Sequence, residues 1–70
     1  MIPQILLVDD DKHCRLVLQE MLDGIGCSVR SVSNGNEALV AFAEALPDIV
    51  FMDLRMPGMD GIEVFHQMRV

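Results

Sequence analysis

The stretch IVFMDLRMPGMDG, residues 49–61, carries the pattern that decides the fold of this chain. Four apolar residues lead directly into an acid, Asp53, and a loop with a proline and two glycines follows. A short aliphatic run without polar alternation is typical of a strand that is buried on both faces of a parallel sheet. Such a strand delivers the carboxylate that follows it to the edge of the sheet.

The same pattern occurs near the start of the chain, where the apolar run QILLV, residues 4–8, ends at Asp9, Asp10 and Asp11. Helical spacing and turn signals predict helices over residues 11–26, 34–47 and 61–70, and strands over 4–8, 27–33 and 48–53. Alternating strands and helices indicate an α/β fold with parallel strands and right-handed crossovers. In a doubly wound sheet, two apolar strands beside a more polar one give the strand order 2-1-3.

All three predicted helices carry an apolar stripe, which in the third consists of Ile62, Phe65 and Met68. In the first helix these positions are Cys14, Leu18, Met21, Leu22 and Ile25. In the second they are Leu39, Phe42, Ala43 and Leu46. Asp11 is predicted to be the N-cap of the first helix, and Arg15 and Arg30 are expected to be solvated.

The topology brings Asp9, Asp10 and Asp53 to one crevice at the carboxyl ends of neighbouring strands. Like charges this close raise each other's pKa or require a cation. Oxygen ligands without a nearby histidine or cysteine pattern favour Mg²⁺. A carboxylate beside such a metal can act as a nucleophile towards phosphorus. Taken singly, however, these acids read as a helix cap, solvated charges and a strand end; only the joint pattern is specific.

Length and composition limit the number of domains, the kinds of partner and the location that this chain can have. Seventy residues form at most one small domain, residues 1–70, and a chain this short is marginal when folded alone. The net charge of −6 argues against direct contact with nucleic acid. No apolar run is long enough to span a membrane and the N-terminus lacks signal-peptide features, so a cytoplasmic location is expected. Cys14 and Cys27 have no metal or redox spacing and are expected to be small buried hydrophobes.

Three segments resemble the receiver domain of response regulators in two-component signalling. They are ILLVDDD, NGNEAL and PDIVFMDLRMPGMDG, and together the resemblance covers essentially the whole chain. The resemblance implies a (βα)3 half of a flavodoxin-like doubly wound sheet, running from the first strand to the third helix. It also implies that Asp53 accepts a phosphoryl group from a histidine kinase or phosphotransfer protein.

The resemblance further implies a ligand set for Mg²⁺: Asp10, Asp53 and the backbone carbonyl of Arg55, with Asp9 acting through the water shell of the metal. Asp60 would cap the third helix. The chain departs from the family in lacking its fourth and fifth strands, together with the Ser/Thr and the Lys that follow them. Because these groups stabilise the transferring phosphoryl group, phosphotransfer by this chain is expected to be impaired.

A truncated receiver leaves the third strand with an open apolar edge, which is a template for pairing. A two-fold homodimer, through that edge or through the helix faces, is therefore expected. Edge pairing would give the order 2-1-3-3′-1′-2′, with an antiparallel central pair. One alternative is a degenerate, early-terminated receiver that serves only as a dimerisation or interaction module. A haloacid-dehalogenase-like phosphotransferase is disfavoured, because Arg55 stands where that class has its second acid.

Overall fold

The computed structural model of the protein describes residues 1–53 and 61–68, which form three strands and three helices in strict alternation. The elements are β1 (Gln4–Val8), α1 (Lys12–Gly24), β2 (Ser28–Val32), α2 (Gly35–Glu44), β3 (Ile49–Met52) and α3 (Gly61–Met68). All six predicted elements are present, and β1 has the predicted bounds. The other two strands are one residue shorter at each end than the sequence indicated.

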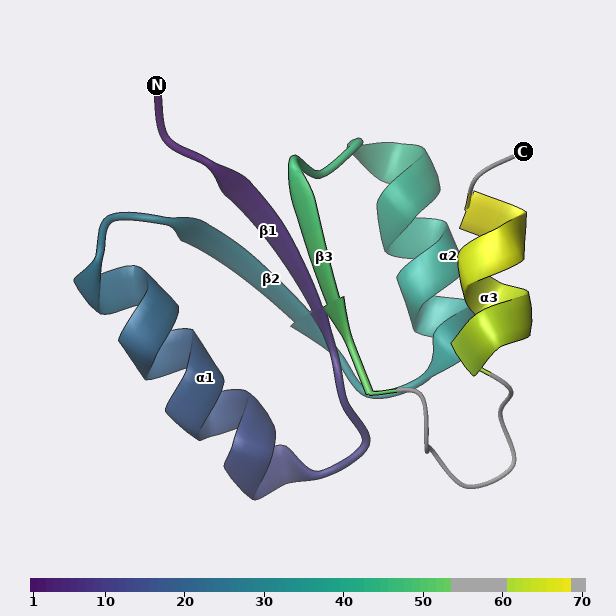
Figure 1. The fold of residues 1–70 in the computed structure, drawn as a ribbon, viewed down its shortest axis with the longest axis horizontal. Coiled ribbons are helices and arrows are strands. Elements are labelled where there is room, and N and C mark those ends of the chain that lie inside the picture. Colours follow the sequence, from purple (N-terminus) through teal and green to yellow (C-terminus); the bar gives the residue numbers. More distant parts are fainter. Residues whose placement is uncertain (54–60, 69–70) are drawn as a thin grey trace.

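The sheet is parallel and has the order β2-β1-β3, as predicted (Figure 1). Residues 5–8 of the central strand are buried, which confirms the interpretation of QILLV as a two-sided strand. Asp48 ties the amino end of β3 to β1, because its N–H donates to the carbonyl oxygen of Gln4 and its carboxylate accepts from the Gln4 N–H, each at 2.7 Å. The relative register of β1 and β3 is therefore set before the first ladder pair, Ile5 with Ile49.

Helices lie on both sides of the sheet, with α1 on one side and α2 and α3 on the other (Figure 1). Alternate residues of β1 point to opposite faces, so Leu6 and Val8 face α2 and α3. They are the centre of one apolar cluster with Val32, Ala38, Ala41, Val64 and Met68. The core of the described part of the chain thus lies mainly between the sheet and the α2–α3 pair.

The predicted core face of α2 is only partly correct. Its buried residues are Gly35, Ala38 and Ala41, with Leu39 and Phe42 partly buried beside them. Leu46 is 75% exposed and Ala43 is exposed. Small side chains allow α2 to approach β1 closely, and this moves the buried stripe by about one residue from the most apolar positions. Leu46 was wrongly assigned to the core face because hydrophobicity alone ranks leucine above alanine.

The predicted core face of α1 is also largely wrong, since no residue of this helix is buried. Met21 and Ile25 are 63% and 75% exposed, and Leu18 and Leu22 are half-buried. The helix packs mainly against β2 and less against β1. It therefore leaves the adjoining face of β3 uncovered, where Ile49 and Phe51 are 47% and 44% exposed.

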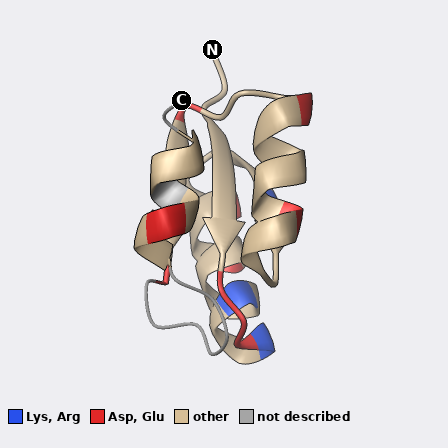
Figure 2. Cartoon of the chain, turned by 90° about the vertical axis from the view of Figure 1, so that its right-hand side faces the viewer, with Lys and Arg blue, Asp and Glu red and all other residues tan. Residues whose placement is uncertain are grey.

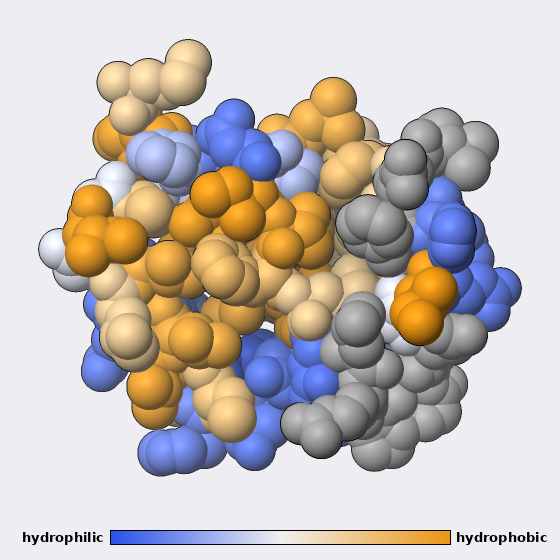
Figure 3. All heavy atoms as spheres, in the orientation of Figure 1, coloured by the Kyte–Doolittle hydropathy of each residue, from blue (hydrophilic) through white to orange (hydrophobic). Residues whose placement is uncertain are grey.

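Apolar side chains gather over the strands and α1 in Figure 3. A groove in this region is lined by Leu7, Leu18, Phe51 and Met52, and Asp9 and Asp53 line it as well. Within the described residues β3 is an edge strand, which agrees with the expected open apolar edge. In the same part of the chain, no helix has the length and apolar character needed to cross a membrane.

Candidate functional site

Asp9 directly follows the central strand, and its backbone holds it at the end of the sheet. Its N–H donates to the carbonyl oxygen of Val32 at 3.2 Å, which extends the β1–β2 ladder by one residue. Its carboxylate accepts a hydrogen bond from the Asp11 N–H at 2.9 Å. Asp9 is the one charged side chain that is buried among the described residues, with 8% of its surface exposed. A buried carboxylate needs such donors, because burial without a partner is costly.

Asp53 occupies the equivalent place after β3. Its N–H donates to the carbonyl oxygen of Val8 at 3.0 Å, so the β1–β3 ladder continues to the acid itself. The side chain is half-buried. Because both ladders end at the same level of the sheet, the two acids that follow β1 and β3 become neighbours although 44 positions separate them in the chain.

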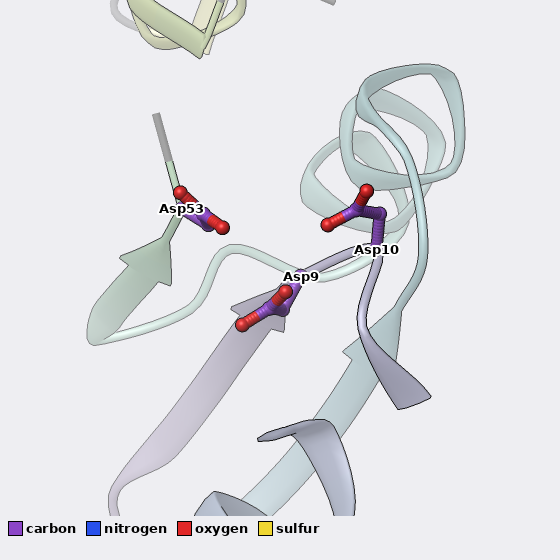
Figure 4. A group of neighbouring side chains, drawn as sticks. All are labelled: Asp9, Asp10 and Asp53. Carbon is purple, nitrogen blue, oxygen red and sulfur yellow. The ribbon is translucent and has the colours of Figure 1, made fainter. Parts of the chain in front are cut away.

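Asp10 completes a group of three carboxylates. The side chains of Asp9, Asp10 and Asp53 converge in the space beyond the strand ends (Figure 4). One carboxylate oxygen from each residue lies within 4.8 Å of the corresponding oxygens of the other two. The group is graded in exposure, since Asp9 is buried, Asp53 half-buried and Asp10 exposed. The predicted convergence of these three acids is therefore present in the structure.

Three carboxylates at this separation repel one another unless a cation or a proton compensates. All the donors are hard oxygens, and one member of the group is open to solvent. This combination suits Mg²⁺, which binds one or two carboxylates and keeps several of its waters. The donor set therefore fits the metal that the sequence pattern predicted. Arg55, whose carbonyl was predicted to be a further ligand, and Asp60, the predicted cap of α3, lie outside the described residues.

Asp11 plays a separate structural part, which confirms its prediction as a helix cap. Its carboxylate accepts hydrogen bonds from the N–H groups of His13 at 2.9 Å and Cys14 at 3.4 Å. These backbone donors, with Cys14 the stronger influence, hold the pKa of Asp11 below its usual value. The third acid of the run thus begins α1 and is not a member of the carboxylate group.

Cys14 was expected to be buried, and the structure shows that it is exposed. The carboxylate of Asp11 raises the pKa of the Cys14 thiol, and partial desolvation and the charges of Asp9 and Asp53 act in the same direction. A thiolate is the reactive form of cysteine. Cys14 is therefore disfavoured as a nucleophile, and Asp53 remains the candidate nucleophile of this site.

Arg15 was predicted to be solvated, and this was wrong. The side chain is half-buried, and its Nη1 donates to the carbonyl oxygen of Asp9 at 2.7 Å. Figure 2 shows basic residues beside the acidic ones at this end of the sheet. Arg30 does lie at the surface, where it forms an exposed ion pair with Glu44. The spacing of Arg15 from Asp9 was available in the sequence, but the contact depends on the direction in which α1 leaves the turn.

Comparison with known proteins places this arrangement in a family. The family model described as "Response regulator receiver domain" matches residues 5–70. The chain belongs to the response regulator receiver domain family. The predicted resemblance is thereby confirmed, and so is the receiver-like half of a flavodoxin-like fold. Receiver domains are signalling domains of two-component systems and are not enzymes in the usual sense.

Named relatives support the same assignment. The receiver chain is 44% identical over 63 residues to the DNA-binding transcriptional regulator NtrC of Salmonella typhimurium, a match that covers 90% of this chain and 13% of NtrC. It superposes with a TM-score of 0.94 on a CheY-like receiver domain from Methylobacillus flagellatus, at 30% identity, covering all of this chain and 59% of that one.

A third relative bears on ligands and partners. The response regulator TrrA of Thermotoga maritima, solved with Mg²⁺ and BeF, matches at 38% identity and a TM-score of 0.90, covering 97% of this chain and 59% of TrrA. TrrA has also been solved in complex with the histidine kinase ThkA. The receiver chain thus spans 59% of each of these two solved chains and 13% of NtrC.

Proposed function

We propose that this receiver chain is a phosphoacceptor module of a two-component phosphorelay. Asp53 accepts the phosphoryl group, and Asp9, Asp10 and Asp53 hold Mg²⁺. One observation carries the proposal: three carboxylate oxygens from three separate positions lie within 4.8 Å of one another at the carboxyl ends of β1 and β3. The Mg²⁺-containing structure of TrrA supports the choice of metal.

The proposed chemistry assigns a distinct task to each acid. A carboxylate oxygen of Asp53 forms a bond to phosphorus as the phosphodonor's own bond to phosphorus breaks, which leaves an acyl phosphate on Asp53. When bound, the metal would supply positive charge to the transferring phosphoryl oxygens. Asp9 is held by the backbone groups of Val32 and Asp11 and by the side chain of Arg15, so it serves as the fixed member of the group. Asp10 is the exposed member and would bind the cation directly.

The phosphodonor in this proposal is a histidine kinase or a phosphotransfer protein. The complex of TrrA with the kinase ThkA supports a partner of this kind. The carbonyl of Arg55 is retained as a proposed third direct ligand beside Asp10 and Asp53, and Asp9 would act through the water shell of the metal. The cytoplasmic location and the assignment of residues 1–70 to one domain stay predictions from the sequence.

We also propose that these 70 residues on their own transfer phosphate slowly. The Ser/Thr and Lys that the family resemblance places near the phosphoryl group have no counterpart among them, and Lys12 lies at the start of α1. Preorganised positive charge and hydrogen-bond donors are a large source of rate acceleration in group transfer. Without these groups we expect the rate of phosphoryl transfer to fall, while Asp53 stays the residue that accepts the phosphoryl group.

Acyl-phosphate labelling tests the phosphoacceptor role. The 70-residue chain is incubated with acetyl phosphate and Mg²⁺, and its intact mass is measured. We expect a phosphoryl adduct that Asp53→Asn abolishes. Asp23→Asn is the matched control, because Asp23 is an exposed acid in the last turn of α1. An adduct that persists in Asp53→Asn rejects Asp53 as the acceptor.

The alternative function, an interaction module without phosphotransfer, has one favouring observation. β3 is an apolar edge strand in the described sheet, and Ile49 and Phe51 are about half exposed. We propose that a second copy of the chain pairs with this edge, in the antiparallel order predicted from the sequence. If Mg²⁺ leaves the thermal stability unchanged while the chain dimerises, the interaction module replaces the phosphoacceptor as the better account.

A further inference from the structure

The turn that carries Asp9, Asp10 and Asp11 is held from several directions by its own neighbours. The N–H of Asp9 donates to Val32, and the carboxylate of Asp9 accepts from the N–H of Asp11. The carbonyl oxygen of Asp11 accepts from the Arg15 N–H at 3.0 Å, which is a first helical hydrogen bond of α1. The carbonyl of Asp9 is contacted by a side chain and not by the backbone of these neighbours.

The guanidinium of Arg15 contacts that carbonyl. Its Nη1 donates to the Asp9 oxygen at 2.7 Å, a short distance that is typical of a charge-assisted hydrogen bond. Because a peptide unit is planar, fixing the direction of the Asp9 carbonyl also fixes the N–H of Asp10. The orientation of this plane, together with the torsions of Asp10 itself, sets where the Asp10 side chain lies.

We propose that Arg15 is the positioning residue of the carboxylate group: by anchoring the carbonyl of Asp9, it orients the Asp9–Asp10 peptide so that the Asp10 carboxylate faces Asp9 and Asp53. This inference rests on the proposed Mg²⁺ site. Arg15 acts through the backbone and through Asp10, and it makes no contact with the phosphoryl group in this proposal. Its chemistry suits the task, since a guanidinium stays ionised and presents its donors in a rigid plane.

A purely electrostatic role and a positioning role of Arg15 predict opposite changes in Mg²⁺ affinity when Arg15 is removed, which allows a sharp test. If Arg15 acted only as a nearby positive charge, its removal would make the site more negative and Mg²⁺ would bind more tightly. If Arg15 positions Asp10, its removal lets the Asp9–Asp10 peptide rotate and Mg²⁺ binds more weakly. Groups that orient metal ligands typically contribute about 10–100-fold to metal affinity.

The experiment is Mg²⁺ titration by isothermal calorimetry at constant ionic strength, on the full 70-residue chain. We expect Arg15→Ala to weaken Mg²⁺ binding by about tenfold or more. Arg15→Lys keeps the charge but lacks the planar fork, and we expect an intermediate affinity. It also serves as the second variant should Arg15→Ala fail to fold.

Two controls separate position from charge. Arg30→Ala removes the same side chain from the exposed ion pair with Glu44 and should leave the Mg²⁺ affinity unchanged. Lys12→Ala removes one positive charge from the first turn of α1, and we expect unchanged or slightly tighter binding. A role in stability alone would lower the melting temperature of Arg15→Ala without changing the affinity of the folded protein.

The outcomes distinguish this inference from the function on which it rests. If the wild-type chain binds no Mg²⁺, the proposed function and the role of Arg15 both fail. If wild type binds Mg²⁺ in a manner that depends on Asp10 and Asp53, and Arg15→Ala binds it equally well or better, the metal site stands and the positioning role of Arg15 is overturned.

Discussion

The backbone N–H of Asp53 donates to the carbonyl oxygen of Val8 at 3.0 Å, and Val8 is the residue that directly precedes Asp9. This single hydrogen bond joins the end of β3 to the end of β1. It sets Asp53 next to Asp9 with the accuracy of a sheet ladder, and a loop would position the acid less well. The carboxylate group is therefore an extension of the sheet, and its geometry depends on the packing that holds β1 and β3 in register.

Removing one acid should change stability in opposite directions with and without metal. In the absence of divalent cations we expect Asp10→Asn to raise the melting temperature, because it relieves repulsion with Asp9 and Asp53. With free Mg²⁺ at ten times its dissociation constant, wild type should gain about 1.4 kcal/mol through binding to the folded state. Thermal unfolding followed by circular dichroism measures both effects.

The comparison has an internal control. Asp23→Asn makes the same chemical change at an exposed position of α1 and should alter neither the metal-free melting temperature nor the gain with Mg²⁺. An equal Mg²⁺-dependent gain in wild type and Asp10→Asn would show that Asp10 does not contact the cation.

The small core should make the fold sensitive to single truncations on the α2–α3 side of the sheet. Leu6 is 2% exposed at the centre of the apolar cluster. We expect Leu6→Ala to lower the free energy of unfolding by about 2–5 kcal/mol, through lost burial and the cavity that remains. Leu46→Ala, at a position that is 75% exposed, should change it by less than about 0.5 kcal/mol. Urea unfolding followed by circular dichroism measures both; similar losses would contradict the assigned core.

A charge on the open strand edge should prevent self-association. Ile49 is 47% exposed on β3, and lysine on an edge strand opposes pairing with another strand. We expect Ile49→Lys to shift the chain from dimer to monomer in sedimentation velocity at micromolar concentration. Val40→Lys places the same charge at a 58% exposed position of α2 and should leave the dimer intact. A wild-type chain that is monomeric and folded would reject the edge-pairing proposal.

The cap of α1 should have a measurable acid dependence. Because the N–H groups of Cys14 and His13 hold the folded-state pKa of Asp11 below its usual value of 3.8, its carboxylate stabilises the fold at pH values above 3.8. This contribution is lost as the pH falls through the lowered, folded-state pKa. Asn also caps helices well but does not titrate.

The difference in stability between wild type and Asp11→Asn should therefore be constant near neutral pH and should shift towards the variant below the usual pKa of Asp. Parallel acid titrations of the helical circular dichroism signal provide the measurement. The double comparison removes the contribution of the other acids, which titrate in both proteins. A difference that does not change with pH would mean that the capping hydrogen bonds do not favour the ionised form.

Much of the site was predictable, because a short stretch of sequence is enough to recognise a strand that ends on an acid, and the alternation of strands and helices is enough to predict a parallel sheet. An apolar run ending on an acid occurs at Val8–Asp9 and again at Met52–Asp53, and parallel strands bring such ends to one edge. The capping role of Asp11 was equally local, since it concerns N–H groups only two and three residues away. The helix faces were less predictable, because hydrophobicity cannot tell which side of a helix meets the sheet.

The sequence by itself determined the order of the elements, the strand order 2-1-3 and the meeting of Asp9, Asp10 and Asp53. Tertiary structure alone decided that Ala38 and Ala41, and not Leu46, bury the face of α2, and that α1 covers β2 while the face of β3 stays open. It also decided that Arg15 reaches back to the carbonyl of Asp9. That contact depends on the angle at which α1 leaves the turn, and this angle is set by packing of the helix on the sheet, which no spacing of residues records.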